Sequence, residues 1–154
     1  MTFTITRESP VGADLTLLFE RHTADMHADT PPESIHMMDS AQLAIPQVHF
    51  YVAREGGVPM AMGAFKTLSG GQGEIKSMHV LAEVRGRGLS KSMLAHVEAQ
   101  ARALGLTRLS LETGVQPTFV AARSLYEKAG YQLCDPFEGY REDPNSLFMT
   151  KELL

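Results

Sequence analysis

A loop that alternates glycine with arginine lies directly before the clearest helical stretch of the sequence, and it could bind phosphate. The loop reads RGRG over residues 85–88, and Lys91 follows closely. The first backbone N–H groups of a helix lack partners within the helix and carry about half a positive charge. Glycines allow an anion to approach this backbone, and the basic side chains add charge. The sequence therefore predicts a phosphate site at the start of the helix.

The loop fits neither of the two common nucleotide-binding patterns. In the mononucleotide pattern GxxxxGK[ST] the lysine follows a glycine, whereas Lys91 follows a serine at a different spacing. The dinucleotide pattern GxGxxG fails because Leu89, Ser90 and Lys91 follow Gly88. For an isolated GxG, a simple turn with solvated arginines is the better interpretation. The arginines, the helix and the chain order favour the phosphate site here.

Length, composition and charge limit the class of protein. The 154 residues, of which 44% are hydrophobic and 21% charged, predict a single globular domain over residues 1–154. A net charge of −4 argues against broad nucleic-acid binding, which requires a basic face. No apolar run approaches the ~20 residues of a membrane span, and the N-terminus lacks the layout of a signal peptide. Cys134 is the single cysteine, so we expect no internal disulfide and a cytoplasmic location.

The pattern of apolar residues predicts the elements that must position the loop. Strands are expected at residues 3–6, 48–55, 60–68, 74–80, 108–112, 131–133 and 146–153. Helices are expected at residues 13–22, from Pro32 through Leu43, at 90–104 and at 118–129. Leu104 is expected on the buried stripe of the third helix. The order is typical of a mixed α/β fold with one strand–helix–strand crossover near the middle.

Two motifs resemble those of the GNAT superfamily of acyl-CoA-dependent N-acyltransferases. Residues 85–90 match the signature Q/R-x-x-G-x-G/A except at the last position, where Ser90, which could cap the helix, replaces glycine or alanine. Residues 122–131, ARSLYEKAGY, match the second hallmark A-x-x-L-Y-x-K-x-G-F/Y in full. The resemblance is strong over residues 48–133. It implies a GNAT fold of the α/β class, with a central, mostly antiparallel twisted sheet of about six or seven strands and about four flanking helices.

The resemblance also implies that acetyl-CoA is the co-substrate, and it implies where that molecule lies. Its pyrophosphate would rest on the backbone amides of residues 87–90, and its pantetheine arm would run along residues 78–80. The thioester would sit where the fourth and fifth strands separate, close to residues 111–113. Many relatives have an asparagine where this chain has Phe119, so we expect packing there in place of a polar contact. The implied cofactor-binding residues are Met78, His79, Val80, Arg85, Gly86, Arg87, Gly88, Leu89, Ser90, Thr113, Phe119, Ala122 and Tyr126.

Acyl transfer to an amine needs a base for the ammonium group and an acid for the departing thiolate. An amine of pKa about 10.4 is neutral in only about one molecule in 10³ at pH 7. Glu74 is the predicted base, because some relatives carry a glutamate on this strand; a solvated carboxylate at a strand edge is the alternative. Tyr126 is the predicted acid, because this phenol often faces the sulfur in the family; a hydrogen-bonded core tyrosine is the alternative. The oxyanion is expected at a backbone N–H near His79.

The acceptor is expected between the N-terminal helices and the loop before the last strand. In relatives the segment that corresponds to 13–45 forms one wall, and here Ser34, His36 and Asp39 are its predicted contacts. Tyr140 and Arg141 are predicted to reach the acceptor from the other side, where Arg141 would suit a carboxylate. An exposed hairpin loop is the alternative for this segment. The N-terminal histidines show no helical i,i+4 ligand pair, so we expect no metal.

These residues predict an N-acetyltransferase in which the acceptor amine attacks acetyl-CoA directly within a ternary complex. The acceptor is expected to be a small amine or an amino-acid-like molecule, and we expect neither a nucleic-acid nor a membrane partner. Relatives are often dimers, so a homodimer is a further expectation. Two alternatives stay open. One is a module of the same fold that binds acyl-CoA without turnover, and the other is an acetyltransferase that modifies proteins or peptides.

Overall fold

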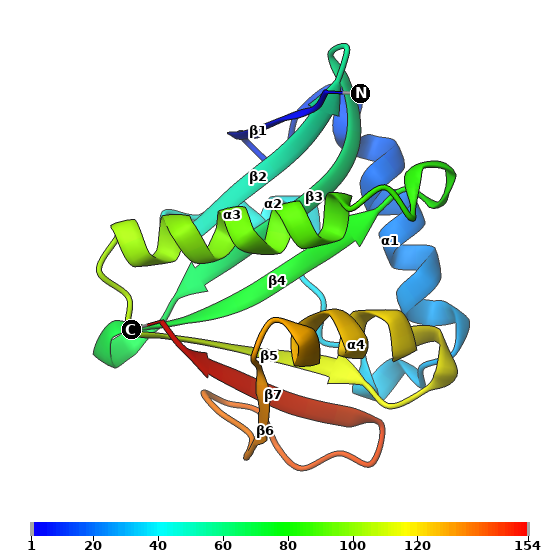
Figure 1. The fold of residues 1–154 in the computed structure, drawn as a ribbon. Coiled ribbons are helices and arrows are strands. Elements are labelled where there is room, and N and C mark those ends of the chain that lie inside the picture. The colour runs from blue at the N-terminus through cyan, green and yellow to red at the C-terminus, as the bar shows by residue number, and fades with distance from the viewer. Residues whose placement is uncertain (1, 154) are drawn as a thin grey trace.

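The computed structural model of this chain describes residues 2–153, which form one seven-stranded sheet with helices on both faces (Figure 1). The strand order is β1-β2-β3-β4-β5-β7-β6, and every neighbouring pair is antiparallel except β4 and β5, which run parallel. The strands are β1 Thr4–Arg7, β2 Val48–Glu55, β3 Val58–Thr67, β4 Gln72–Val80, β5 Arg108–Gly114, β6 Gln132–Cys134 and β7 Ser146–Glu152. The expected mixed, mostly antiparallel sheet is confirmed.

Four α-helices flank the sheet, and five short 3₁₀ turns connect elements among the described residues. The α-helices are α1 Thr16–Ala28, α2 Ser40–Leu43, α3 Leu89–Ala103 and α4 Val120–Lys128. The 3₁₀ turns are η1 Ala13–Leu15, η2 Pro32–Ser34, η3 Ser69–Gly71, η4 Ala82–Val84 and η5 Pro117–Phe119. Figure 1 shows α3 and α4 on the near face of the sheet. It shows α1 on the far face, beside the end of β4.

The helix predicted from Pro32 through Leu43 is wrong. Pro32 does start a turn, but η2 lasts only to Ser34, and Ile35 is already extended with φ −93° and ψ 118°. Asp39 then begins α2 with a capping box, in which its carboxylate accepts from the Gln42 backbone and its own N–H donates to the Gln42 side chain. A residue that caps one helix cannot lie inside another, and the chain therefore crosses this region as two short turns.

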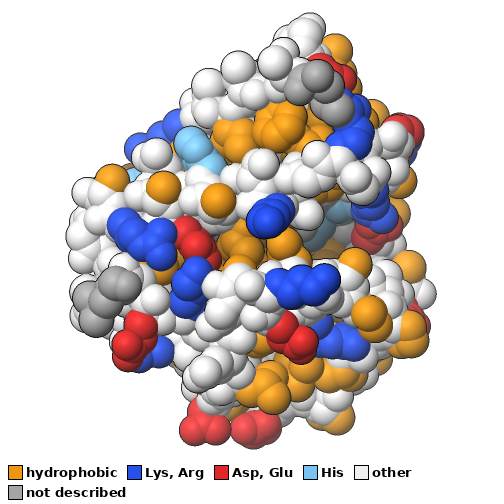
Figure 2. Space-filling view, viewed as in Figure 1, with side chains coloured by type: hydrophobic (Ala, Val, Ile, Leu, Met, Phe, Trp, Pro, Cys, Tyr) orange, Lys and Arg blue, Asp and Glu red, His pale blue; other side chains and the backbone are white. Residues whose placement is uncertain are grey.

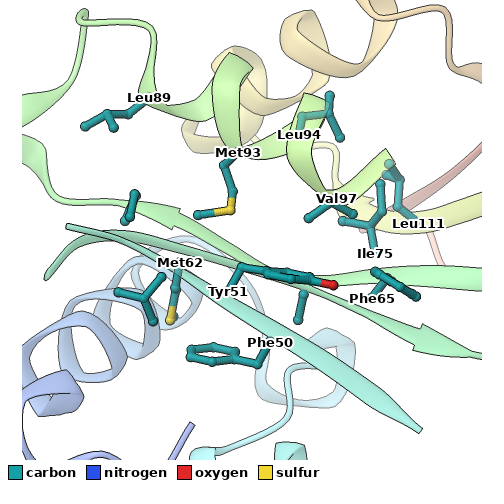
Figure 3. Close-up of a cluster of buried hydrophobic side chains, with 14 of the residues drawn as sticks. Phe50, Tyr51, Met62, Phe65, Ile75, Leu89, Met93, Leu94, Val97 and Leu111 are labelled. Atoms are coloured by element: carbon teal, nitrogen blue, oxygen red, sulfur yellow. The ribbon is translucent and has the colours of Figure 1, made fainter. Parts of the chain in front are cut away.

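Apolar side chains from both faces of the sheet form the core. Figure 3 shows Met93 and Val97 of α3 packed on one face, while Phe50 and Met62 lie on the opposite face toward α1. All four side chains are almost completely buried. Leu104 does not join them: it is 51% exposed, contrary to expectation, because it is the C-cap residue of α3 and lies past the last turn that contacts the sheet.

The surface of the described residues carries charges of both signs. In the view of Figure 2, basic and acidic side chains are interspersed, without one continuous basic region. None of the helices within residues 2–153 has the length and apolar character that a membrane crossing would need.

Candidate active site

The sheet opens between its two parallel strands, and this opening organises the site. β4 and β5 pair over only three positions, of which the last joins Glu74 to Ser110. Beyond this pair the two strands diverge toward α1 and α4 (Figure 1). Since diverging strands cannot hydrogen-bond across the gap, side chains and backbone groups of both edges face a shared space. This is the separation of strands at which the thioester was expected.

A β-bulge lies on β4 beside this opening. Ala64 pairs with Lys76 and Met62 pairs with His79, so that Ser77 and Met78 together oppose Gly63. Ser77 has a φ of +57°, an uncommon value for a residue with a side chain. A Cβ atom on Gly63 would lie 2.6 Å from Met78 Sδ, so the bulge packs against a position where only glycine fits well. A bulge leaves backbone groups unpaired, and these are candidates for contacts with a ligand.

A groove of about 390 Å³ runs from the start of α3 to the middle of α4. The predicted cofactor-binding residues that line it are Met78, His79, Val80, Arg85, Gly86, Gly88, Leu89, Ser90, Phe119, Ala122 and Tyr126. Gly88 is the N-cap of α3 with φ +80°, and Gly86 has φ +83°. No atom lies within 4 Å of the place where a Cβ would stand on either glycine, so the backbone is open to a ligand. Ser90 makes no capping hydrogen bond, because the helix begins at Leu89.

The two arginines of the loop are already paired within the protein. Arg85 donates to Asp25 of α1 at 3.1 Å and to the Val80 carbonyl at 3.0 Å. Arg87 turns away from the groove and donates to Glu55 at 2.5 Å. The Arg87 side chain therefore does not line the groove. This differs from the prediction that the basic side chains of the loop add positive charge around a bound phosphate. The backbone amides at the start of α3 remain the principal feature of the site for an anion.

Tyr126 lies where the groove meets a smaller inner cavity. Its side chain is 6% exposed, and it lines both spaces. Burial raises the pKa of its phenol, so the hydroxyl keeps its proton at neutral pH. The ring makes an edge contact with Tyr131, whose own hydroxyl donates to Glu98 of α3 at 2.8 Å. Tyr126 is thus held from behind by Tyr131 and lines both spaces.

The inner cavity, of about 110 Å³, joins the groove to a larger cavity on the other side of the sheet opening, and we call it the junction. The residues that it shares with the groove are His22, Met26, Met78, Phe119, Ala122 and Tyr126. The residues that it shares with the larger cavity are His36, Met37, Met38, Glu74, Lys76 and Tyr140. Leu111, Glu112 and Thr113, beside which the thioester is predicted, line the junction but neither of the other two spaces. A molecule in the groove and one in the larger cavity can therefore meet here.

Glu74 is buried in the middle of the sheet, at the border of the junction and the larger cavity. It is 5% exposed on a strand with neighbours on both sides, so the alternative of a solvated strand-edge carboxylate is wrong. Its Oε2 accepts a hydrogen bond from the Tyr140 hydroxyl at 2.5 Å and lies 3.1 Å from Lys76 Nζ. Lys76 also donates to the Tyr140 hydroxyl at 3.2 Å. The three groups form a closed set of partners.

The larger cavity, of about 650 Å³, collects most of the predicted acceptor contacts. His36, Tyr140 and Arg141 line it, and the His36 ring packs edge-on against the Tyr140 ring. Ser34 does not line it: its side chain is buried and accepts from Asn145 Nδ2 at 3.3 Å. The segment before β7 is therefore a wall of the cavity and not merely an exposed hairpin loop. We call this space the acceptor cavity.

Sequence reasoning gave no chemical role to two titratable residues of the site. Glu112 lines the junction, and burial raises the pKa of its carboxyl group. His22 of α1 lines both junction and groove, and burial lowers its pKa to about 4, helped by the neighbouring His79. The two imidazole rings lie 5.3 Å apart. Little in the sequence indicated that Glu112 and His22 belong to the site, because a single polar residue on an apolar strand or helix usually faces solvent.

His79 carries a buried ring nitrogen, Nε2, that has no hydrogen-bond partner among residues 2–153, and its side chain lines the groove. Burial lowers the pKa of His79. Within the same residues, no group of three or more His, Cys, Asp and Glu side chains is placed to hold a metal ion.

Comparison with known proteins shows that this chain is similar to acyltransferases in sequence and in fold. The profile of the acetyltransferase (GNAT) family matches residues 16–131. A Bacillus subtilis (strain 168) protein named "Uncharacterized N-acetyltransferase YsnE" is 44% identical over 92% of this chain and 94% of its own length. "IAA acetyltransferase" of Azospirillum brasilense is 42% identical over 97% of each chain. The crystal structure of a putative acyl-CoA N-acyltransferase from Klebsiella pneumoniae superposes with a TM-score of 0.79 over 99% of each chain, at 30% identity.

Proposed function

Because the chain belongs to the acetyltransferase (GNAT) family and is an acyltransferase, we propose that it transfers an acetyl group from acetyl-CoA to the primary amine of a small, amino-acid-like acceptor. The observation that carries this proposal is the continuous path from groove to junction to acceptor cavity, with Tyr126 and Glu74 at its two borders. Donor and acceptor enter from opposite ends and react in a ternary complex.

The groove suits the donor. The pyrophosphate of acetyl-CoA binds the open backbone amides at the start of α3, where Gly86 and Gly88 leave room for its oxygens. The pantetheine arm follows β4 past the bulge and lies against Phe119 and Met78, both of which line the groove. The acetyl thioester then reaches the junction, where an unpaired backbone N–H of the bulge stabilises the oxyanion.

Tyr126 is the proposed general acid. Its phenol is protonated at neutral pH because burial raises the pKa, and its hydroxyl has no hydrogen-bond partner among residues 2–153 that would compete with the sulfur. A thiolate leaving the tetrahedral intermediate needs a proton donor of this kind. Tyr126 supplies it from the groove side, so the acceptor amine can approach from the other side.

The acceptor cavity suits a molecule with both an amine and a carboxylate. Lys66 and Arg141 line it, and neither forms an ion pair with any of residues 2–153, so both are available to a carboxylate. Glu33, Glu138 and Glu142 line the same cavity and favour a cationic group at its mouth. The named activity of the Azospirillum brasilense relative, IAA acetyltransferase, agrees with a small acceptor.

A thiol-release assay with matched acceptors tests the proposed function. The purified protein is given acetyl-CoA and a panel in which each amino acid is paired with the same amine lacking its carboxylate. We expect CoA release that depends on acceptor, with higher kcat/KM for the member that carries the carboxylate. Binding of CoA without release for any amine would overturn the enzymatic proposal and favour a binding module. Release with the decarboxylated members alone would overturn the acceptor class only.

A further inference from the structure

We infer that Glu112, and not Glu74, takes the proton from the acceptor's ammonium group, while Glu74 positions the acceptor together with Lys76 and Tyr140. This inference rests on the proposed function and deepens it by assigning the base. It concerns two carboxylates that the structure places on one side of the sheet opening, in different surroundings.

The register of the strands places the two carboxylates on the same face. Glu74 pairs with Ser110 in the last position before β4 and β5 separate, and Glu112 is two residues further along β5. Side chains two residues apart on a strand share a face. Their neighbours Ile75 and Leu111 point the other way, toward α3, as Figure 3 shows. Glu74 and Glu112 therefore both face the acceptor side, where Tyr140 and His36 lie.

The two carboxylates differ in their partners. Glu74 Oε2 accepts a hydrogen bond from the Tyr140 hydroxyl and lies 3.1 Å from Lys76 Nζ, so two partners within the protein already occupy it. Glu112 forms no ion pair with any of residues 2–153. A base that must accept a proton works best without a cation bound to it, and Glu112 meets this condition where Glu74 does not.

The surroundings of Glu112 also favour proton uptake. Burial raises the pKa of its carboxyl group, and the negative charge of Glu74 adds to this effect. The Ser146 hydroxyl on β7 and the charges of His36 and Lys76 act in the opposite direction but leave the pKa raised. His22 of α1, Tyr126 of α4 and Tyr140 complete the titratable groups that line the junction. Burial and a neighbouring carboxylate are the surroundings in which a carboxylate takes up a proton most readily.

Position along the path gives the third reason. Glu112 lines the junction, where the thioester and the amine meet, and does not line the wider acceptor cavity. Glu74 lines both spaces. Tyr126 enters the junction from α4, on the α3 side of the sheet, whereas Glu112 faces the acceptor side. The base therefore lies on the side from which the amine arrives, and the acid lies on the side toward which the thiolate departs.

The proton balance of the reaction follows from this placement. The ammonium group transfers one proton to the Glu112 carboxylate and becomes a neutral amine. Its lone pair forms the C–N bond to the thioester carbonyl, and the C–S bond then breaks as the tetrahedral intermediate collapses. The thiolate takes the Tyr126 proton, and the phenolate recovers a proton from the nitrogen that has attacked. Glu112 releases its proton to solvent through the acceptor cavity before the next cycle.

Paired amide substitutions test the assignment of the base. Glu112→Gln and Glu74→Gln keep size and shape while removing the carboxylate, and acetyl-CoA affinity by calorimetry shows whether each variant keeps the groove. We expect Glu112→Gln to lower kcat by about 10²–10⁴-fold, the usual range for a general base, and to remove the acid limb from the pH profile of kcat/KM. We expect Glu74→Gln to keep that limb and to raise the acceptor KM.

A second acceptor makes the test independent of simple misfolding. A fluorinated analogue of the same acceptor has an amine of lower pKa, which is largely neutral at the assay pH and needs no base. The defect of Glu112→Gln should shrink with this analogue, whereas a merely structural defect would not. The inference would be overturned if Glu112→Gln showed the same loss of turnover with both acceptors, or if the acid limb were lost in Glu74→Gln alone. The proposed function would still stand in either case, provided that the wild type releases CoA in the presence of an acceptor. A wild type that releases no CoA with any amine would remove both.

Discussion

Tyr140 and Glu74 lie 66 positions apart in the sequence, yet the phenol of one donates a 2.5 Å hydrogen bond to the carboxylate of the other. This contact ties the segment before β7 to the central strand β4, and Lys76 closes the set by contacting both groups. The ring of Tyr140 also packs on Phe137 and Phe148. A wall of the acceptor cavity is therefore fixed to the strand that borders the junction.

Replacing Tyr140 with phenylalanine removes this hydrogen bond and leaves the aromatic packing. A hydrogen bond to a charged group is worth about 1.5 kcal/mol or more, which corresponds to a change in affinity of about tenfold. We expect Tyr140→Phe to raise the acceptor KM by about that factor and to change kcat little. Steady-state kinetics with the best acceptor of the panel measure both. A fall in kcat with constant KM would instead give Tyr140 a direct part in the chemistry.

Tyr126→Phe tests the proposed acid. The substitution keeps the edge contact with Tyr131 and removes only the hydroxyl. We expect kcat to fall by about 10²-fold or more, with unchanged affinity for acetyl-CoA, because the proton is needed only when the thiolate leaves. Tyr51→Phe is the matched control, since Tyr51 is also a buried phenol, 3% exposed, but lies in the core away from the groove. Turnover equal to that of the control would remove Tyr126 from the mechanism.

Gly88→Ala tests the phosphate cradle. Gly88 has φ +80° at the N-cap of α3, where an alanine is strained by about 1 kcal/mol and places a methyl group over the amides. We expect the Kd for CoA to rise at least tenfold, measured by calorimetry at low salt. Gly57→Ala is the control, because Gly57 has nearly the same φ, +81°, in the β2–β3 turn and an equally open Cβ position. The two variants should lose similar stability, and CoA affinity should fall only at Gly88.

The groove could be predicted from the sequence better than the acceptor cavity, for a physical reason. The loop, the start of α3 and the face of α4 are continuous segments, and their residues meet the groove because local structure directs them there. Arg87 is the exception, since its long side chain can reach Glu55 on β2, which no local pattern indicates.

The acceptor cavity is assembled from distant segments, and its contacts depend on details that sequence patterns do not carry. The capping box of Asp39 broke the expected helix, and Asn145 holds Ser34 away from the cavity. Glu112 shows the same limit in another form. Glu112 lies two residues after Ser110, so the sequence could predict that both side chains share a face of β5. Only the separation of β4 from β5 in the folded chain makes this face border a cavity and not solvent.

The buried imidazole of His22 predicts a specific loss of stability in mild acid. Its pKa falls from about 6.5 in the unfolded chain to about 4 in the folded protein, because burial disfavours the charged ring and His79 adds repulsion. Between these two values the unfolded chain binds a proton that the folded protein does not bind. The free energy of unfolding therefore falls as the pH drops from 6.5 toward 4, by at most about 1.4 kcal/mol per pH unit from this group.

His22→Gln isolates this contribution. Glutamine does not titrate, so the difference in unfolding free energy between pH 7 and pH 5 should be smaller in the variant than in the wild type by up to about 2 kcal/mol. Urea denaturation at both pH values measures the difference. His27→Gln is the control, because it makes the same exchange at an exposed position near the end of the same helix. If His22→Gln and His27→Gln gave the same pH dependence, the ring of His22 would have to accept its proton in the folded protein, and the junction would then be open to water on the α1 side.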